Sequence, residues 1–98
     1  MRVISQDGTM DMPYEMSIVW CEDSGAVLFE PIGETGEYQT FAKYSTEEKA
    51  KKAMEELRYA YMCHSLVKMG KTPPDGIDEK LTIGLSGVFQ FPEEEELE

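Results

Sequence analysis

STEEKAKKAMEELRYAYMCHSLVKM, at residues 45–69, is the stretch that decides the fold. Mostly apolar side chains recur in it at steps of three and four residues, which a helix would place on one face. This face comprises Ala50, Ala53, Met54, Leu57, Ala60, Tyr61, His64 and Val67. We therefore predict one long amphipathic helix over about residues 46–69.

Local signals mark both ends of this helix. Ser45 and Glu48 have the spacing of a capping box, in which the serine hydroxyl meets the backbone N–H of Glu48 and the glutamate carboxylate reaches back. Gly70 is a good helix stop, and Pro73-Pro74 forbids continuation. A helix of this length can cover one face of a sheet, and its alanines permit close approach.

The residues before the helix have the period of two that is typical of half-buried strands. Over residues 10–16 apolar side chains alternate with Asp11, Pro13 and Glu15. Pro13 lacks an N–H, which places this strand at a sheet edge. Gln6-Asp7-Gly8-Thr9 has the composition of a two-residue hairpin turn. Further β-prone runs, separated by turn residues, lie at 2–5, 17–21, 26–29 and 38–42. These runs predict an antiparallel meander.

The residues after the helix predict one more strand. Val88-Phe89-Gln90-Phe91 is β-prone and ends at Pro92; we expect it to return to the sheet, because alone it would favour aggregation. Residues 71–87 are less informative: a turn or loop is expected at 72–76, and either a helical turn or a weak strand at 77–85. The predicted fold class is α+β, an antiparallel β-meander of about five strands plus a C-terminal strand, packed against one long helix at about 46–69.

The chain has 98 residues, which predicts a single domain, here residues 1–92. Residues 93–98 are an acidic run that we expect to be a disordered tail. Leu97-Glu98 also has the composition of a residual cloning linker and is left out of the fold prediction. Two cysteines are too few for a disulfide framework, although a single disulfide between them remains an alternative. No membrane segment or secretion signal is found, so the expected location is the cytoplasm.

The net charge of −11 is unevenly distributed. Residues 1–44 carry eight acidic side chains against Arg2 and Lys43, whereas residues 45–70 have a net charge of +1. Long-range attraction to nucleic acids or to an anionic membrane is thus disfavoured, and we expect neither as a direct partner. The acidic N-terminal half also supports a second hypothesis, in which the carboxylates imitate a phosphate backbone and occupy the basic site of a nucleic-acid-binding protein.

Cys21, Cys63 and His64 are the first candidates for chemistry. A Cys–His nucleophile pair requires side chains within hydrogen-bond reach, but neighbours on a helix diverge by about 100°. Cys21 could meet His64 across the interface between sheet and helix, yet a core cysteine beside a boundary histidine is the favoured interpretation. A zinc site would require four ligands at short paired spacings, which two cysteines and one histidine do not supply.

Other clusters also favour structural interpretations. Asp7, Asp11 and Glu15 are spaced by fours on a hairpin and match no calcium loop. Gly33 and Gly36 do not directly precede a helix, so no phosphate-binding loop is indicated. The helix bases are interleaved with acids, which is typical of a solvated face; they are Lys49, Lys51, Lys52 and Arg58, beside Glu47, Glu48, Glu55 and Glu56. We predict no catalytic, cofactor-binding or metal-binding residue, and no cofactor.

Methionines recur on the expected strand and helix, and are adaptable contacts. They are Met10, Met12 and Met16 on the strand, and Met54, Met62 and Met69 on the helix. A core position is predicted for Met54 and is the favoured prediction for the strand methionines. The strand methionines would line a protein-binding surface if the helix does not cover them.

Four stretches carry a resemblance that covers about half of the chain. MRVISQDGT at 1–9 with PYE at 13–15, YSTEEKA at 44–50 and VFQFP at 88–92 resemble a group of small uncharacterised proteins of Firmicutes and their prophages. The resemblance implies a bacterial or phage origin and transfers no site residue. The function predicted is that of a small acidic accessory protein acting through protein–protein contacts without catalysis. The partner is an unknown protein, with a homodimer through an uncovered sheet region as an alternative, and a DNA-mimic inhibitor is the alternative function.

Overall fold

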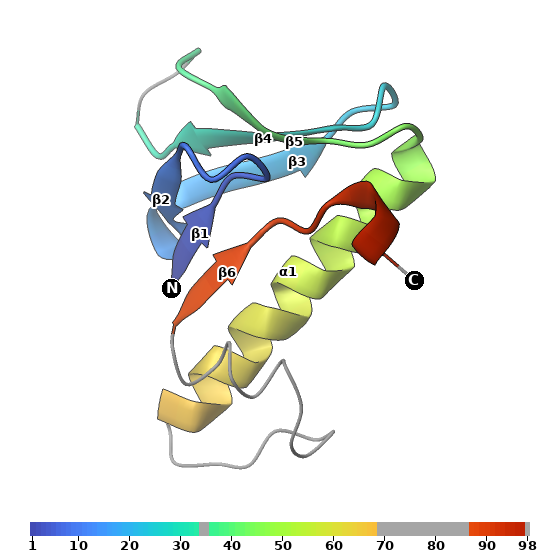
Figure 1. Ribbon diagram of the computed structural model, residues 1–98. Helices are drawn as coiled ribbons and strands as arrows, with labels where there is room; N and C mark the ends of the chain where they lie inside the picture. Colours follow the sequence, from blue (N-terminus) through green and yellow to red (C-terminus); the bar gives the residue numbers. More distant parts are fainter. Residues whose placement is uncertain (34–35, 69–86, 98) are drawn as a thin grey trace.

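The computed structural model describes residues 1–33, 36–68 and 87–97, which form one long helix and two three-stranded sheets (Figure 1). The first sheet has the order β2-β1-β6 and the second the order β3-β4-β5. The elements are β1 (Arg2–Ile4), β2 (Asp11–Pro13), β3 (Ser17–Cys21), β4 (Ala26–Pro31), β5 (Gln39–Lys43), α1 (Glu47–Lys68) and β6 (Val88–Gln90), with 3-10 turns η1 (Tyr14–Met16) and η2 (Glu94–Glu96). The predicted α+β class, the six strands and the long helix are confirmed.

The six strands are divided between two sheets where the sequence predicts a single meander. β1 pairs with β2 in antiparallel fashion and with β6 in parallel fashion, so that Val3 faces Met12 on one side and Phe89 on the other. The final strand thus returns to a sheet, as predicted. The loop predicted at 72–76 and the helical turn or weak strand predicted at 77–85 lie outside the described residues.

The connection between β1 and β2 is longer than the predicted two-residue hairpin turn. Ile4 pairs with Asp11, so six residues form the connection. A turn centred on Asp7-Gly8 would need a positive φ at both residues, whereas only Gly8 has one, at 78°. The Asp7 carboxylate explains this conformation, because it accepts hydrogen bonds from the Ser5 hydroxyl and from both the N–H and the hydroxyl of Thr9. The hairpin-turn prediction is therefore wrong.

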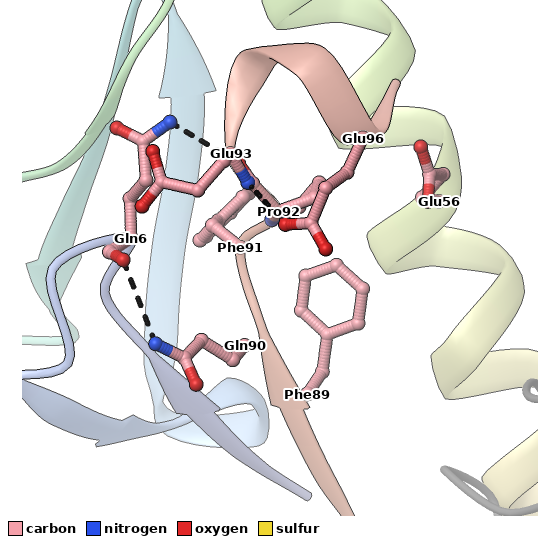
Figure 2. A pocket seen from close by; sticks show the side chains of 8 residues that line it. All are labelled: Gln6, Glu56, Phe89, Gln90, Phe91, Pro92, Glu93 and Glu96. Carbon is pink, nitrogen blue, oxygen red and sulfur yellow. Dashed lines mark hydrogen bonds between the residues drawn. The ribbon is translucent and has the colours of Figure 1, made fainter. Parts of the chain in front are cut away.

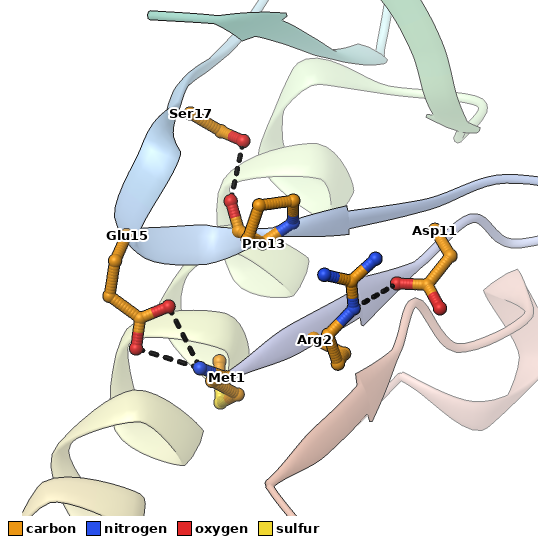
Figure 3. Close-up of polar contacts among 6 residues, drawn as sticks. All are labelled: Met1, Arg2, Asp11, Pro13, Glu15 and Ser17. Atoms are coloured by element: carbon orange, nitrogen blue, oxygen red, sulfur yellow. Dashed lines mark hydrogen bonds and ion pairs between the residues drawn. The ribbon is translucent and has the colours of Figure 1, made fainter.

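The strand predicted over residues 10–16 ends at Pro13. Tyr14–Met16 form the turn η1, which carries the chain from the first sheet to the second. Figure 3 shows two contacts that hold this corner: the Met1 amino group donates to the Glu15 carboxylate at 2.7 and 2.8 Å, and the Ser17 hydroxyl donates to the Pro13 carbonyl at 2.6 Å. The period of two fails here because Tyr14 turns toward the helix, where its ring lies 4.6 Å from that of Tyr61.

α1 begins one residue later than predicted and has a different cap. The Thr46 hydroxyl accepts the backbone N–H of Lys49 at 3.2 Å, whereas the Ser45 hydroxyl donates to the carboxylate of Glu94. The predicted Ser45–Glu48 capping box is thus wrong, because Ser45 is held by a residue far along the chain. The face turned to the sheets buries Ala50, Ala53, Leu57, Ala60 and Cys63.

The core lies between α1 and the two sheets, and aromatic rings join its parts. Phe29 stacks on Phe41 with ring centroids 4.4 Å apart and meets Phe91 edge-on at 5.9 Å. Phe89 in turn meets Phe91 at 5.4 Å, so β6 and the residue after it connect both sheets. In Figure 1, α1 and the first sheet lie on the same side of the second sheet. Within the described residues, no helix has the length and apolar content of a membrane-crossing segment.

The acidic C-terminal residues differ from the predicted disordered tail. Glu93–Leu97 take a defined conformation, and Glu98 lies outside the described residues. The Glu94 carboxylate accepts hydrogen bonds from the Ser45 N–H and hydroxyl and from Lys49 Nζ, which lies 3.0 Å away. Leu97 packs against the core. These contacts offset the repulsion among the glutamates that the sequence suggests.

Candidate interaction surface

The cysteines and the histidine occupy the positions expected of core and boundary residues. Cys63 is fully buried and Cys21 half-buried, and no disulfide joins the two. His64 lies near Glu15 and beside Gly87, where an added Cβ would be 3.1 Å from the imidazole. Within the described residues, no three His, Cys, Asp or Glu side chains are placed to hold a metal ion.

The three hairpin carboxylates each have a structural partner. Burial disfavours the charge of Glu15, but its hydrogen bonds with the Met1 ammonium outweigh this, so its pKa lies below the usual range. Asp11 accepts a hydrogen bond from Arg2 Nε at 2.8 Å (Figure 3). Hydrogen bonds from the side chains of Thr9 and Ser5 lower the pKa of Asp7 to about 2. These residues therefore brace the β1–β2 connection and the corner after β2.

Two of the basic residues of the helix are also engaged with acids. Lys49 Nζ lies 3.0 Å from Glu94, and Lys51 Nζ lies 3.9 Å from Glu47. This arrangement agrees with the solvated face that the interleaved charges indicate.

A hollow of about 340 Å³ opens between the C-terminal residues and α1 (Figure 2). Its apolar lining comes from Phe89, Phe91 and Pro92, and its rim carries the carboxylates of Glu56, Glu93 and Glu96. Two of these carboxylates accept hydrogen bonds within the turn η2. The Glu96 carboxylate accepts the Glu93 N–H at 2.8 Å, and the Glu93 carboxylate accepts the Glu96 N–H. The lining has amides and carboxylates and, among the described residues, no cysteine, histidine or serine.

The outward side of the second sheet has a different character. Across the sheet, Trp20 of β3 pairs with Leu28 of β4, which pairs with Thr40 of β5. Their neighbours Val27 and Phe29 belong to the core, so the alternation along the strand points Leu28 away from it.

An aromatic pair covers this outward side. The rings of Trp20 and Tyr38 lie 5.9 Å apart in an edge-to-face arrangement. Trp20 is on β3 and Tyr38 immediately precedes β5, so the rings must meet across the central strand β4. This explains why Leu28 is only 3% exposed although it does not belong to the core cluster.

Exposed apolar side chains continue this surface toward one end of the sheet. Ile18 is 50% exposed and Tyr38 53% exposed, and at the end of the strands Met16 is 60% and Ile32 55% exposed. The Ile32 N–H donates to the Met16 carbonyl at 2.9 Å, which places these two residues side by side. We call this surface the outer face; its apolar residues are Met16, Ile18, Trp20, Leu28, Ile32 and Tyr38.

Carboxylates surround the outer face. Glu30 lies on it directly opposite Ile18, Glu37 adjoins Tyr38 in the chain, and Glu22-Asp23 form the turn between β3 and β4. In the part of the chain that the structure describes, none of these four side chains makes an ion pair. Lys43, at the end of β5, donates to the Ser24 carbonyl at 3.0 Å. The outer face is therefore apolar with an acidic rim.

An uncovered sheet region was expected, but not the residues that form the outer face, although the sequence contains a signal for them. The prediction concerned the strand methionines, of which Met10 and Met12 pack against the core and Met16 is exposed. Ser17–Cys21, by contrast, has apolar residues in both alternating sets, which is typical of a strand covered on both faces. The one long helix can cover only one face of this strand, so the sequence indicates a second apolar face that the helix does not cover.

Comparisons of the chain with protein-family models, with curated proteins and with solved structures find no match. The assignment of a function therefore depends on the geometry of the described residues.

Proposed function

We propose that this protein is a small non-catalytic interaction protein that binds a partner protein through the outer face. The observation that carries the proposal is the aromatic pair Trp20–Tyr38 with exposed Ile18, Met16 and Ile32 beside it. Contiguous exposed apolar surface is typical of protein-binding sites, and Trp and Tyr are enriched among the residues that dominate binding energy. The candidate nucleophile Cys63 is buried, which also favours a role other than catalysis.

A bacterial or phage origin and a cytoplasmic location belong to the same proposal. The resemblance of residues 1–9 and 44–50 to Firmicutes and prophage proteins supports the origin, and the low number of cysteines, two, is compatible with the location.

The test is affinity capture from an extract of the source organism with three forms of the protein. The wild type and the control variant Met62→Ser, which changes an exposed helix residue, should retain the same defined partner. The double variant Trp20→Ser/Tyr38→Ser should lose the partner while still unfolding in one cooperative thermal transition. Retention by the double variant would show that the outer face is not the binding site, and capture of no protein by any form would contradict an interaction role.

A nucleic-acid mimic is the second candidate. It is favoured by the carboxylates of Glu22, Asp23, Glu30 and Glu37, which no base neutralises within the described residues. In this case the captured partner would be a DNA-binding protein, released by salt and by competing duplex DNA. A partner that stays bound in the presence of excess DNA would exclude the mimic and leave the first proposal.

A further inference from the structure

We infer that the partner presents a basic segment, whose Arg or Lys side chains lie over the Trp20–Tyr38 rings and pair with Glu30. This inference rests on the proposed function and adds the chemistry of the partner. It starts from the position of Glu30 on the outer face itself, two residues along β4 from Leu28, which the two rings cover. Two residues along a strand span about 7 Å, so a carboxylate borders the aromatic pair.

A ring face beside a carboxylate is suited to a cationic side chain. The face of an indole or phenol ring attracts a cation within about 6 Å of its centre, and a neighbouring carboxylate adds a charge-assisted hydrogen bond. Arginine satisfies both requirements at once, since its planar guanidinium stacks on rings and donates in two directions. The aliphatic stems of such side chains would cover Ile18, which is directly opposite Glu30.

Charge also decides between the alternative occupants of this surface. A second copy bound through a two-fold axis would place the same acidic rim, with Glu30 inside it, against itself, and each chain carries a net charge of −11. Nucleic acid and anionic lipid are repelled for the same reason. A partner with a basic segment is the occupant that complements both the rings and the rim.

Trp20 is the only tryptophan of the chain, so its fluorescence reports directly on the outer face. The probes are three synthetic peptides of equal length without Trp or Tyr, in which Leu alternates with Arg, Gln or Glu. The Arg peptide should change the emission of Trp20 in a saturable manner and bind at least about tenfold more tightly than the Gln peptide, and the Glu peptide should not bind. Equal binding of the Arg and Gln peptides, or no response to the Arg peptide, would overturn the inference.

Two variants of equal charge change separate a specific site from general attraction. Glu30→Gln should weaken binding of the Arg peptide about threefold to tenfold, whereas Glu55→Gln, on the exposed side of α1, should leave it within about twofold. Equal effects of the two variants would mean attraction by net charge alone.

Sedimentation should show a monomer; a dimer that Trp20→Ser dissociates would identify a second copy as the occupant instead. If the Gln peptide binds as well as the Arg peptide and Trp20→Ser abolishes the binding of both, the partner is not basic, but the outer face remains a binding site and the proposed function stands. Failure of the proposed function itself would be seen in the capture experiment.

Discussion

At the scale of single residues, Gly25 shows how the backbone is fixed in a turn. Gly25, between β3 and β4, has a φ of 93°, and its N–H donates to the Glu22 carbonyl while its carbonyl accepts the Tyr44 N–H. A Cβ at Gly25 would lie 2.1 Å from the Tyr44 carbonyl oxygen, which real structures do not allow. The turn therefore requires glycine both for its conformation and for the close approach of the chain that leads into α1.

Gly25→Ala should lower the free energy of unfolding by at least about 2 kcal/mol, because the left-handed conformation and the steric overlap act together. Gly36→Ala is the matched control: its φ is 86°, but no atom of the described residues lies within 4 Å of the added Cβ, so a loss of about 1 kcal/mol is expected. Urea unfolding of both variants measures the difference. Equal losses would contradict the close contact at Gly25.

The Asp7 carboxylate makes stability depend on pH. Its pKa is about 2 in the folded protein and 3.8 as its ordinary value, so the ionised form is favoured by folding. The resulting stabilisation is fully present above about pH 4 and is lost as the pH falls toward 2. Asp7→Asn should flatten the decline of the unfolding midpoint in that interval, measured by thermal melts in buffers from pH 5 to 2. A variant with the same pH profile as the wild type would show that Asp7 does not contribute.

At the scale of elements, the start of α1 depends on the C-terminal turn η2. Glu94 accepts the Ser45 N–H and pairs with Lys49, and the same hydrogen bonds, with that of the Ser45 N–H foremost, hold its pKa below the usual range. The Tyr44 hydroxyl donates to the Pro92 carbonyl at 2.8 Å, and Gln6 donates to the same oxygen. Burial of Tyr44, together with the nearby glutamates, raises the pKa of its hydroxyl, so it remains a donor.

Glu94→Ala should lower the melting temperature by a few degrees and speed hydrogen exchange of the Ser45 amide, because that N–H loses its acceptor. Glu95→Ala, which changes a neighbouring exposed carboxylate, is the control and should leave the exchange rate unchanged. Exchange followed by NMR at pH 7 gives the comparison. An unchanged Ser45 amide in the Glu94 variant would mean that the turn is not what protects it.

At the scale of the whole molecule, β6 brings the C-terminal end of the chain against the N-terminal strand β1. It supplies the parallel partner of β1, and Phe89 and Phe91 fill the core between the sheets and α1. Phe91 reaches Phe29 of the second sheet, so the two sheets share one core. With total stability of about 5–15 kcal/mol expected for a domain, the loss of two buried phenylalanines would exceed what the rest of the core can sustain.

A chain that ends after Gly87 should therefore lose cooperative unfolding and bind a hydrophobic dye. A chain that ends after Glu96 removes only Leu97 and Glu98 and should keep a sharp transition. Circular dichroism melts and dye fluorescence distinguish the two outcomes. Cooperative unfolding of the shorter chain at the wild-type temperature would contradict a single shared core.

The sequence by itself determined the elements whose signals are local. The steps of three and four residues specified α1, and alternating residues with turn glycines specified most strands, because these patterns depend on the geometry of one segment. Only the tertiary structure decided the division into two sheets, the parallel pairing of β1 with β6, the replacement of the Ser45 capping box by Glu94, and the aromatic pair on the outer face. Each of these depends on residues far apart in the chain, and such contacts form only once the core has brought them together.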